Sequence, residues 1–171
     1  MIILGINGYH GDASACILVD GQLVAAAEEE RFRRIKHWAG LPTESIKYCL
    51  GEAQVRLNEV DHIAINRDPK AHFLKKIFHL FSKHPSVSAI QDRLTNATKV
   101  RDFQMVLSEK FNFSPDQLKA RFHSVEHHMA HFASTFLVSP FDKAAIASID
   151  GFGDFVSTMV GVGVDQNVRS L

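Results

Sequence analysis

The sequence has few cysteines, no long hydrophobic run and no excess of charge of either sign. Its two cysteines, Cys16 and Cys49, form no CxxC pattern, which indicates buried thiols in a reducing compartment and argues against a zinc knuckle or a disulfide. The 19 basic and 19 acidic residues balance, so the counterion release that drives general nucleic-acid binding is not expected. No apolar run approaches the roughly 20 residues of a membrane span, and the opening MIILGI lacks the basic front of a signal peptide. These absences predict a cytoplasmic protein with no membrane partner and no nucleic-acid partner.

Apolar runs at the start of the chain predict a strand-rich opening. With 46% hydrophobic and 22% charged residues, the 171-residue chain can bury a sizeable core. Three β-type runs are followed by one helical run and a further β-type run, at residues 2–7, 14–20, 23–30, 43–53 and 60–65. Asp20-Gly21 is a hairpin signal, so the first three runs are predicted to form an antiparallel meander. Thr43 is the predicted cap of the helix.

The next part of the chain changes to a basic, amphipathic helical pattern. Between residues 68 and 110, lysines and histidines separate large apolar residues at helical spacing, namely Phe73, Leu74, Ile77, Phe78 and Phe81. Such a helix could dock on a membrane surface or a partner protein. It could equally be an insertion packed on its own protein, and the pattern leaves both alternatives open.

The last part of the chain repeats an arrangement found at the beginning. Its predicted elements are a strand, a helix ended by Pro140, and two strands joined by the turn GFGD, at residues 122–125, 128–138, 143–150 and 155–165. A strand followed by a turn with glycine and an acid, and then by a second strand, thus occurs near residue 10 and again near residue 150. Sheets of α/β proteins place their ligands at the carboxyl ends of strands.

This repetition predicts an α/β protein with an actin-like ATPase (RNase H-like) fold. Residues 1–142 are expected to form the first lobe, with a mixed sheet and a helical insertion over 68–112. Residues 143–171 are expected to begin a second lobe that is truncated, so the fragment should lack turnover by itself. The hairpin turns of such a fold hold the phosphates of a nucleotide, which makes Gly151 and Gly153 candidate cofactor contacts.

The stretch VEHHMAHFAS places three histidines in front of a run of small residues. His127 and His131 are four positions apart, so a helix presents both imidazoles on one face. Asp150, at the end of a buried strand, could complete a set of two histidines and one acid with an open position, which suits zinc or ferrous iron. The alternative is that the imidazoles only form hydrogen bonds at the start of a packed helix.

The first turn, LGINGYHGDASA, brings an acid and a histidine next to glycines. His10 and Asp12 could act as a general base or orient a hydroxyl group. Gly8 and Gly11 permit tight turning and expose backbone amides. The alternative is an Asx-type turn, in which Asp12 caps its own backbone.

Charged residues gather in the stretch EEERFRRIKHWAG. Aromatic and aliphatic residues are interleaved with them, so only some of the charges can face solvent. Arg31, Lys36 and His37 are therefore candidates for binding an anionic or acyl-phosphate group. The alternative is an ordinary solvated strand end.

Two blocks of the sequence resemble one enzyme family. LGINGYHGDASACILVDGQLVAAAEEERFRRIKHWAGLP and VEHHMAHFASTFLVSPFDKAAIASIDGFGD are similar to the N-terminal part of the NodU/CmcH-type O-carbamoyltransferases, and they occur in the same order. The first turn departs from many relatives, since it reads HGDAS where they read HDAS. The segment from about 68 to 112 carries no motif of the family.

The resemblance implies a two-domain enzyme that modifies a small molecule. A C-terminal YrdC-like domain beyond this sequence would convert carbamoyl phosphate and ATP into carbamoyl adenylate. The actin-like domain, similar to the tRNA threonylcarbamoyl transferase, would then pass the carbamoyl group to a hydroxyl of a small-molecule acceptor.

The resemblance also assigns roles to individual residues. His127 and His131 match the metal-binding histidine pair of the family, and Asp150 matches the acid after the next strand. His128 matches no ligand. Asp12, with His10 and Lys36, matches the polar groups on the acceptor and carbamoyl sides, where Asp12 would be the base or orienting group and Lys36 a contact to carbamoyl or phosphate.

Two alternatives to this function remain, and the second is the weaker one. An actin-like binding or regulatory module without catalysis would use the basic helical segment to dock a partner, and its histidines would be structural. A sugar kinase of the same superfamily is disfavoured, because the first turn lacks the Asp-x-Gly-Thr phosphate signature.

Overall fold

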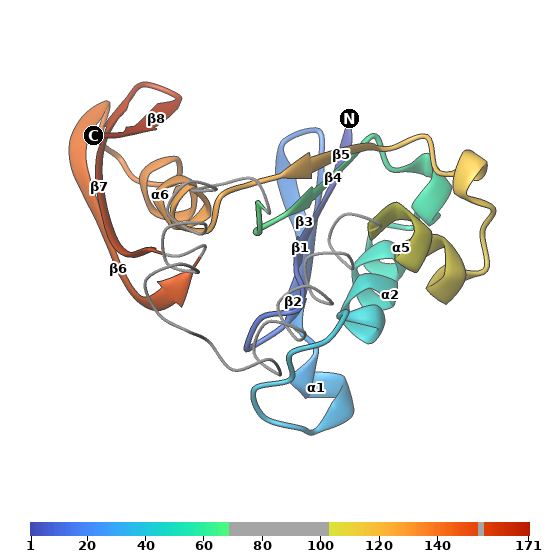
Figure 1. The fold of residues 1–171 in the computed structure, drawn as a ribbon. Helices are drawn as coiled ribbons and strands as arrows, with labels where there is room; N and C mark the ends of the chain where they lie inside the picture. Colours follow the sequence, from blue (N-terminus) through green and yellow to red (C-terminus); the bar gives the residue numbers. More distant parts are fainter. Residues whose placement is uncertain (69–102, 154–155) are drawn as a thin grey trace. The chain divides into compact units, whose positions relative to one another are not determined.

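The computed structural model describes residues 1–68, 103–153 and 156–171 (Figure 1). These residues form two compact units, one made of 1–66 with 103–124 and one made of 67–68 with the described part of 125–171. Most of the expected helical insertion lies outside the described residues, so its amphipathic pattern stays a prediction. None of the helices in the described parts of the chain has the length and hydropathy needed to cross a membrane.

The first unit is built on a five-stranded mixed sheet. Its strands lie in the order β3-β2-β1-β4-β5, with the bounds β1 Ile2–Asn7, β2 Ser14–Val19, β3 Gln22–Glu28, β4 His62–Ile65 and β5 Arg121–Ser124. β1, β2 and β3 pair antiparallel, which confirms the predicted meander. β4 pairs parallel to β1, and β5 pairs parallel to β4. A parallel pair needs a crossover connection, and helix α2 lies on the crossover from β3 to β4.

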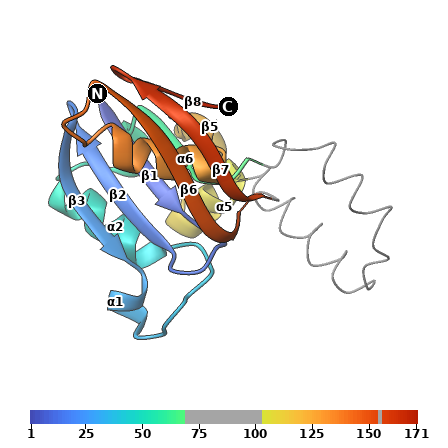
Figure 2. The same ribbon diagram turned by 90° about the vertical axis from the view of Figure 1, so that its left-hand side faces the viewer.

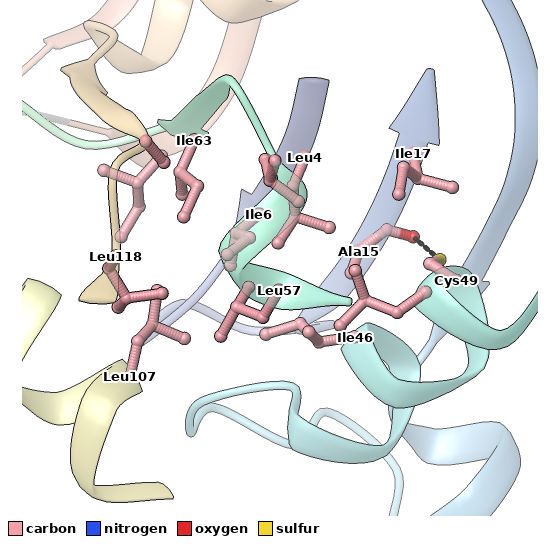
Figure 3. Packing of buried hydrophobic residues seen from close by; sticks show 14 of the residues in the cluster. Leu4, Ile6, Ala15, Ile17, Ile46, Cys49, Leu57, Ile63, Leu107 and Leu118 are labelled. Carbon is pink, nitrogen blue, oxygen red and sulfur yellow. Dashed lines mark hydrogen bonds between the residues drawn. The ribbon is translucent and has the colours of Figure 1, made fainter. Parts of the chain in front are cut away.

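Helices α2 Thr43–Glu52 and α5 Phe103–Phe111 lie on one face of this sheet, whereas α1 Glu30–Arg33 follows the end of β3 and buries no residue. Two 3-10 turns, η1 Leu57–Glu59 and η2 Pro115–Gln117, precede β4 and β5. α2 packs on β2 and β3 through the predicted apolar face, which buries Ile46, Cys49 and Leu50. Figure 3 shows Ile46 and Cys49 of α2 next to Ala15 of β2, and all three belong to the same buried cluster as Leu4 and Ile17. Each fully buried side chain of this size contributes about 1.5 to 3 kcal/mol of transfer free energy.

The two cysteines are free thiols in this unit. Cys49 is fully buried, and its Sγ donates to the carbonyl oxygen of Ala15 at 3.4 Å. Burial raises the pKa of the Cys49 thiol to about 11. Cys16 is half-buried. The expectation of a packed thiol therefore holds fully for Cys49 and in part for Cys16.

Two element boundaries of the first unit differ from the prediction by two residues, and the others by at most one. β3 ends at Glu28 and not at residue 30, because Glu29 turns into the interior and the chain then enters α1. β4 begins at His62 and not at residue 60, because Leu57 is buried within the 3-10 turn η1 that precedes it. In both cases a side chain next to the strand, Glu29 or Leu57, is buried between two elements.

The second unit is a three-stranded antiparallel sheet with one helix packed on it. The strands follow the order β6-β7-β8, with the bounds β6 Lys143–Gly153, β7 Val156–Val164 and β8 Asn167–Ser170. Helix α6, His127–Phe136, contacts all three strands (Figure 2). The observed contacts group α6 with the strands that follow it. The expected division into two lobes after residue 142 stays a prediction.

The strands of this unit differ from the prediction at two points. β6 was expected to end at Asp150 before a GFGD turn, but it continues to Gly153, which pairs with Val156 after an irregular register. β8 was not predicted, because the four residues NVRS are too short and polar to show strand alternation.

Glycines on β7 let α6 approach the sheet closely. A Cβ at Gly163 would lie 2.5 Å from the ring of Phe136, and a Cβ at Gly161 would lie 2.4 Å from the ring of Phe132. Both rings are buried. The alternation in GVGV therefore places two glycines on the sheet face that receives two phenyl rings of the helix.

Candidate metal centre

Helix α6 begins at His127, one residue earlier than predicted, because the residue before it caps the helix. Glu126 has an extended backbone, and its Oε2 accepts a hydrogen bond of 2.8 Å from the backbone amide of Met129. The cap satisfies one of the amides that a helix start leaves without an intrahelical partner. It fixes the first turn of the helix and so the position of His127.

Three side chains of the second unit converge on one point. The Nε2 of His127 lies 2.6 Å from Oδ2 of Asp150 and 3.0 Å from the Nε2 of His131. The Nε2 of His131 lies 3.5 Å from the same Asp150 oxygen. The histidines come from one face of α6, as their spacing predicts, and the acid comes from β6. One ligand atom from each residue thus lies within 4.8 Å of the others.

The separations of these atoms suit a single small cation. Atoms bound about 2.1 Å from one ion lie about 3.0 Å apart in octahedral geometry and about 3.4 Å apart in tetrahedral geometry. The observed separations of 2.6, 3.0 and 3.5 Å bracket these values. His127 is buried, whereas the side chains of His131 and Asp150 are 47% and 34% exposed. Two imidazoles and a carboxylate with an accessible side are a donor set for zinc or ferrous iron.

Asp150 is held as a carboxylate. The hydrogen bond from His127, with a further one of 2.6 Å from the amide of Gly151 to Oδ1, lowers the pKa of Asp150 to about 2. The acid is therefore ionised throughout the physiological range, as a metal ligand must be. Gly151, expected from the sequence to contact a nucleotide, lies next to this cluster and orients its acid.

His128 points away from the cluster. Its side chain is fully buried, and its Nε2 donates to the carbonyl oxygen of Val156 at 2.9 Å. In that tautomer Nδ1 accepts from the hydroxyl of Ser148, at 2.8 Å. His128 therefore ties α6 to β6 and β7, in agreement with its exclusion from the ligands.

A candidate residue of the first turn contacts a candidate residue of the charged stretch EEERFRRIKHWAG. Nδ1 of His37 lies 2.8 Å from Oδ1 of Asp12, and both side chains are mostly exposed. A side-chain contact this exposed adds little to stability. The side-chain amide of Asn7 donates to the carbonyl oxygen of Asp12 at 2.9 Å.

Gly8 and Gly11 were expected to permit tight turning. The left-handed backbone conformations of this turn lie at Tyr9 and Asp12, with φ of 60° and 61°. Backbone bonds to a neighbouring segment hold the turn in this shape, since Tyr9 N donates to the carbonyl oxygen of Gly40 at 3.1 Å.

The other predicted residues are dispersed. His10, Arg31 and Lys36 are exposed. Gly153 lies in the β6–β7 ladder. The structure therefore assembles two groups from the predicted set, the cluster of His127, His131 and Asp150 in the second unit and the Asp12–His37 pair in the first.

The comparison with known protein families covers almost the entire chain. The family model described as the carbamoyltransferase N-terminus matches residues 2–170. This chain belongs to the carbamoyltransferase N-terminal family. The resemblance predicted from the first-turn and histidine blocks is thereby confirmed.

Individual relatives match nearly the whole of this chain. An uncharacterized protein of Synechocystis is 37% identical over 170 residues, which cover 94% of this chain and 27% of that protein. The nodulation protein NolNO of Sinorhizobium fredii is 34% identical over 166 residues, which cover 96% of this chain and 23% of that protein. The chain thus spans about a quarter of the length of these relatives.

Solved structures support the fold. YeaZ from Pseudomonas aeruginosa matches 99% of this chain and 63% of its own, with a TM-score of 0.53 and 18% sequence identity. The fold is the predicted actin-like (RNase H-like) one, with a mixed sheet. At this identity the likeness concerns the fold alone.

The predictions from the sequence did not identify one buried acid of this chain. Glu29 was grouped with an ordinary charge run, yet its side chain is fully buried. The strand period of two offers a signal that could have found it, because Ala25, Ala27 and Glu29 fall on one face of LVAAAEEE.

Proposed function

We propose that the full-length protein is an O-carbamoyltransferase. It would transfer a carbamoyl group from carbamoyl adenylate, made from carbamoyl phosphate and ATP by a YrdC-like domain, to a hydroxyl of a small-molecule acceptor. The observation that carries the proposal is the convergence of His127, His131 and Asp150 in a member of the carbamoyltransferase family. The family match supports the reaction class, and the cluster supports a metal-dependent site.

In this proposal the metal is iron or zinc, held by the two Nε2 atoms and by the Asp150 carboxylate. When bound, it would act as a Lewis acid toward the phosphate or the carbamoyl oxygen of the adenylate. Gly151 keeps the acid oriented through its amide, and Glu126 keeps the helix start in place. Such partners behind the ligands commonly change metal affinity by about 10- to 100-fold when they are removed.

The Asp12–His37 pair would handle the proton of the acceptor hydroxyl. Asp12 accepts the Nδ1 hydrogen of His37, which leaves the Nε2 of His37 as the atom able to take a proton. Asp12 is then the orienting group, which is one of the two roles expected for it from the sequence. As the acceptor oxygen bonds to the carbamoyl carbon, its proton passes to His37 and AMP leaves. Arg31 and Lys36 would offer positive charge to the departing phosphate.

The test uses the full-length protein and its natural metal. His127→Ala and His131→Ala are expected to lower metal affinity by about a hundredfold or more, and to abolish carbamoyl transfer that depends on carbamoyl phosphate and ATP. Metal content is measured by elemental analysis and transfer by product mass. His123→Ala is the matched control, because His123 is an exposed histidine of the other unit.

Unchanged metal content and transfer rate in both ligand variants would refute the metal assignment. Metal binding without any carbamoyl transfer by the wild type would refute the proposed reaction. That second result would favour a binding or regulatory module.

A further inference from the structure

We propose that Glu29 is a positioning residue. Its buried carboxylate holds the segment 33–38 against the first turn and so sets the contact between Asp12 and His37. The catalytic consequence rests on the proposed function, whereas the structural part does not.

The carboxylate of Glu29 is surrounded by hydrogen-bond donors. Its Oε2 accepts from the amide and the hydroxyl of Ser45, at 2.9 and 3.0 Å. Its Oε1 accepts from Nε of Arg33 at 2.7 Å and from the amide of Glu44 at 3.2 Å. The hydroxyl of Thr43 lies 3.4 Å from the same oxygen. Both oxygens are acceptors, so an amide in this place would set its NH2 group against donors in either orientation.

The contacts of Glu29 continue into the segment that carries His37. The Arg33 guanidinium lies over the ring of Trp38, 4.5 Å from its centroid, and donates to the hydroxyl of Thr43 at 2.8 Å. Trp38 directly follows His37 in the chain. Arg33 thus links the buried carboxylate to the residue next to the proposed proton acceptor.

The backbone of Glu29 reaches the first turn as well. Its amide donates to the carbonyl oxygen of Ala13 at 2.8 Å, and the amide of Ala13 donates to the carbonyl oxygen of Trp38 at 3.0 Å. Ala13 directly follows Asp12. Asp12 and His37 each precede one member of the hydrogen-bonded pair Ala13–Trp38. This backbone bond therefore limits the distance between Asp12 and His37.

The backbone of these residues needs such support. Asp12, Arg34 and His37 have φ of 61°, 59° and 55°, a left-handed backbone conformation that residues other than glycine seldom adopt. Strained residues of this kind persist where the surrounding structure over-determines them. Glu29 supplies that constraint from a position with no access to solvent.

A simpler role for Glu29 would be to cap α2. The residue at the N-cap of α2, Pro42, makes no side-chain cap bond, and Glu29 accepts from the amides of Glu44 and Ser45. A cap alone would stabilise the helix without affecting the segment 33–38. The experiment must therefore separate the cap from the link through Arg33.

The test compares Glu29→Gln and Arg33→Ala in the full-length protein, with Glu28→Gln as the matched control. Glu28 is the exposed residue before Glu29, at the end of β3, and Arg33→Ala leaves the cap bonds in place. Limited trypsin cleavage after Arg34 and Lys36 reports the order of the segment, and circular dichroism reports folding. Steady-state carbamoyl transfer separates kcat from KM.

The two variants are expected to speed cleavage in the segment about tenfold and to lower kcat about ten- to hundredfold, because a small displacement of a proton acceptor has effects of this size. Glu28→Gln should match the wild type. If Arg33→Ala leaves both cleavage and kcat unchanged, Glu29 is only a cap and the proposal is wrong. If the wild type shows no transfer, the proposed function fails, and the cleavage rates alone decide the positioning role.

Discussion

Gly163→Ala tests how tightly the packing of α6 on β7 determines the metal cluster. α6 carries both histidines of the cluster, and β6, the neighbour of β7, carries the acid. The helix rests on β7 where Gly163 meets the ring of Phe136. A methyl group at this one position should therefore move the helix relative to the strands without touching a ligand.

The magnitude follows from the distances. The new Cβ would lie 2.5 Å from ring atoms of Phe136, whereas ordinary contact begins at 3.4 Å, so the ring must move by about 1 Å. Phe136 is only 4% exposed, and it has no solvent side to move into. Overpacking of this kind costs about 1 to 3 kcal/mol. Metal sites tolerate shifts of only about 0.5 Å, so metal affinity should fall about tenfold or more.

The measurements are the free energy of unfolding by denaturant and the affinity for zinc, on the purified protein. Phe136→Leu in the Gly163→Ala background should recover part of both losses, since the smaller side chain makes room for the methyl group. Gly51→Ala is the control, because a Cβ there meets nothing within 4 Å. It should stabilise α2 by about 0.5 to 1 kcal/mol.

Two results would refute this reasoning. Gly163→Ala could prove as stable as the wild type, in which case the close packing of helix on strand is not needed. Alternatively, Phe136→Leu could fail to recover stability in that background, in which case the ring is not the group that the methyl displaces.

Two further predictions concern buried polar groups. His128→Leu should lower the free energy of unfolding by about 1 to 3 kcal/mol, because it leaves the hydroxyl of Ser148 and the carbonyl of Val156 without their partner. Metal content of the folded variant should stay unchanged, and a loss of metal would make His128 a ligand. Burial raises the pKa of the Glu29 carboxyl, but the hydrogen bonds that it accepts lower the pKa more, to below the ordinary value of 4.5. Its contribution to stability is thus full above about pH 4.5 and is lost as the pH falls through the depressed value. The stability difference between wild type and Glu29→Gln should therefore be constant near neutral pH and shrink in acid, and a difference that grows in acid would contradict the assignment.

Local patterns in the sequence predicted most of the elements. The meander of β1 to β3 followed from three short apolar runs and the Asp20-Gly21 turn, because hairpins depend on residues close in sequence. The amphipathic spacing of α2 was sufficient to place Ile46, Cys49 and Leu50 in the core. The spacing of His127 and His131 likewise fixed their common face once α6 was recognised as a helix.

Elements that depend on distant partners were missed or misplaced. β8 exists because β7 provides an edge for four mostly polar residues, which no local pattern indicates. Glu29 is buried because donors from α2 and Arg33, up to 16 residues away, surround its carboxylate. In the sequence it is one of three consecutive glutamates.

The two candidate groups of residues differ in how far the sequence predicted them. By itself the sequence determined the family. It also determined the helix that carries His127 and His131 and the strand that carries Asp150, since the pattern of each element lies within its own residues. It also singled out Asp12 and His37, but assigned them separate roles. Only the tertiary structure brought Nδ1 of His37 to 2.8 Å from Oδ1 of Asp12, with both residues in the left-handed backbone conformation. The cause is physical: which polar groups meet across the chain depends on hydrogen bonds that form only after the sheet and α2 have packed, and these bonds leave no periodic trace in the sequence.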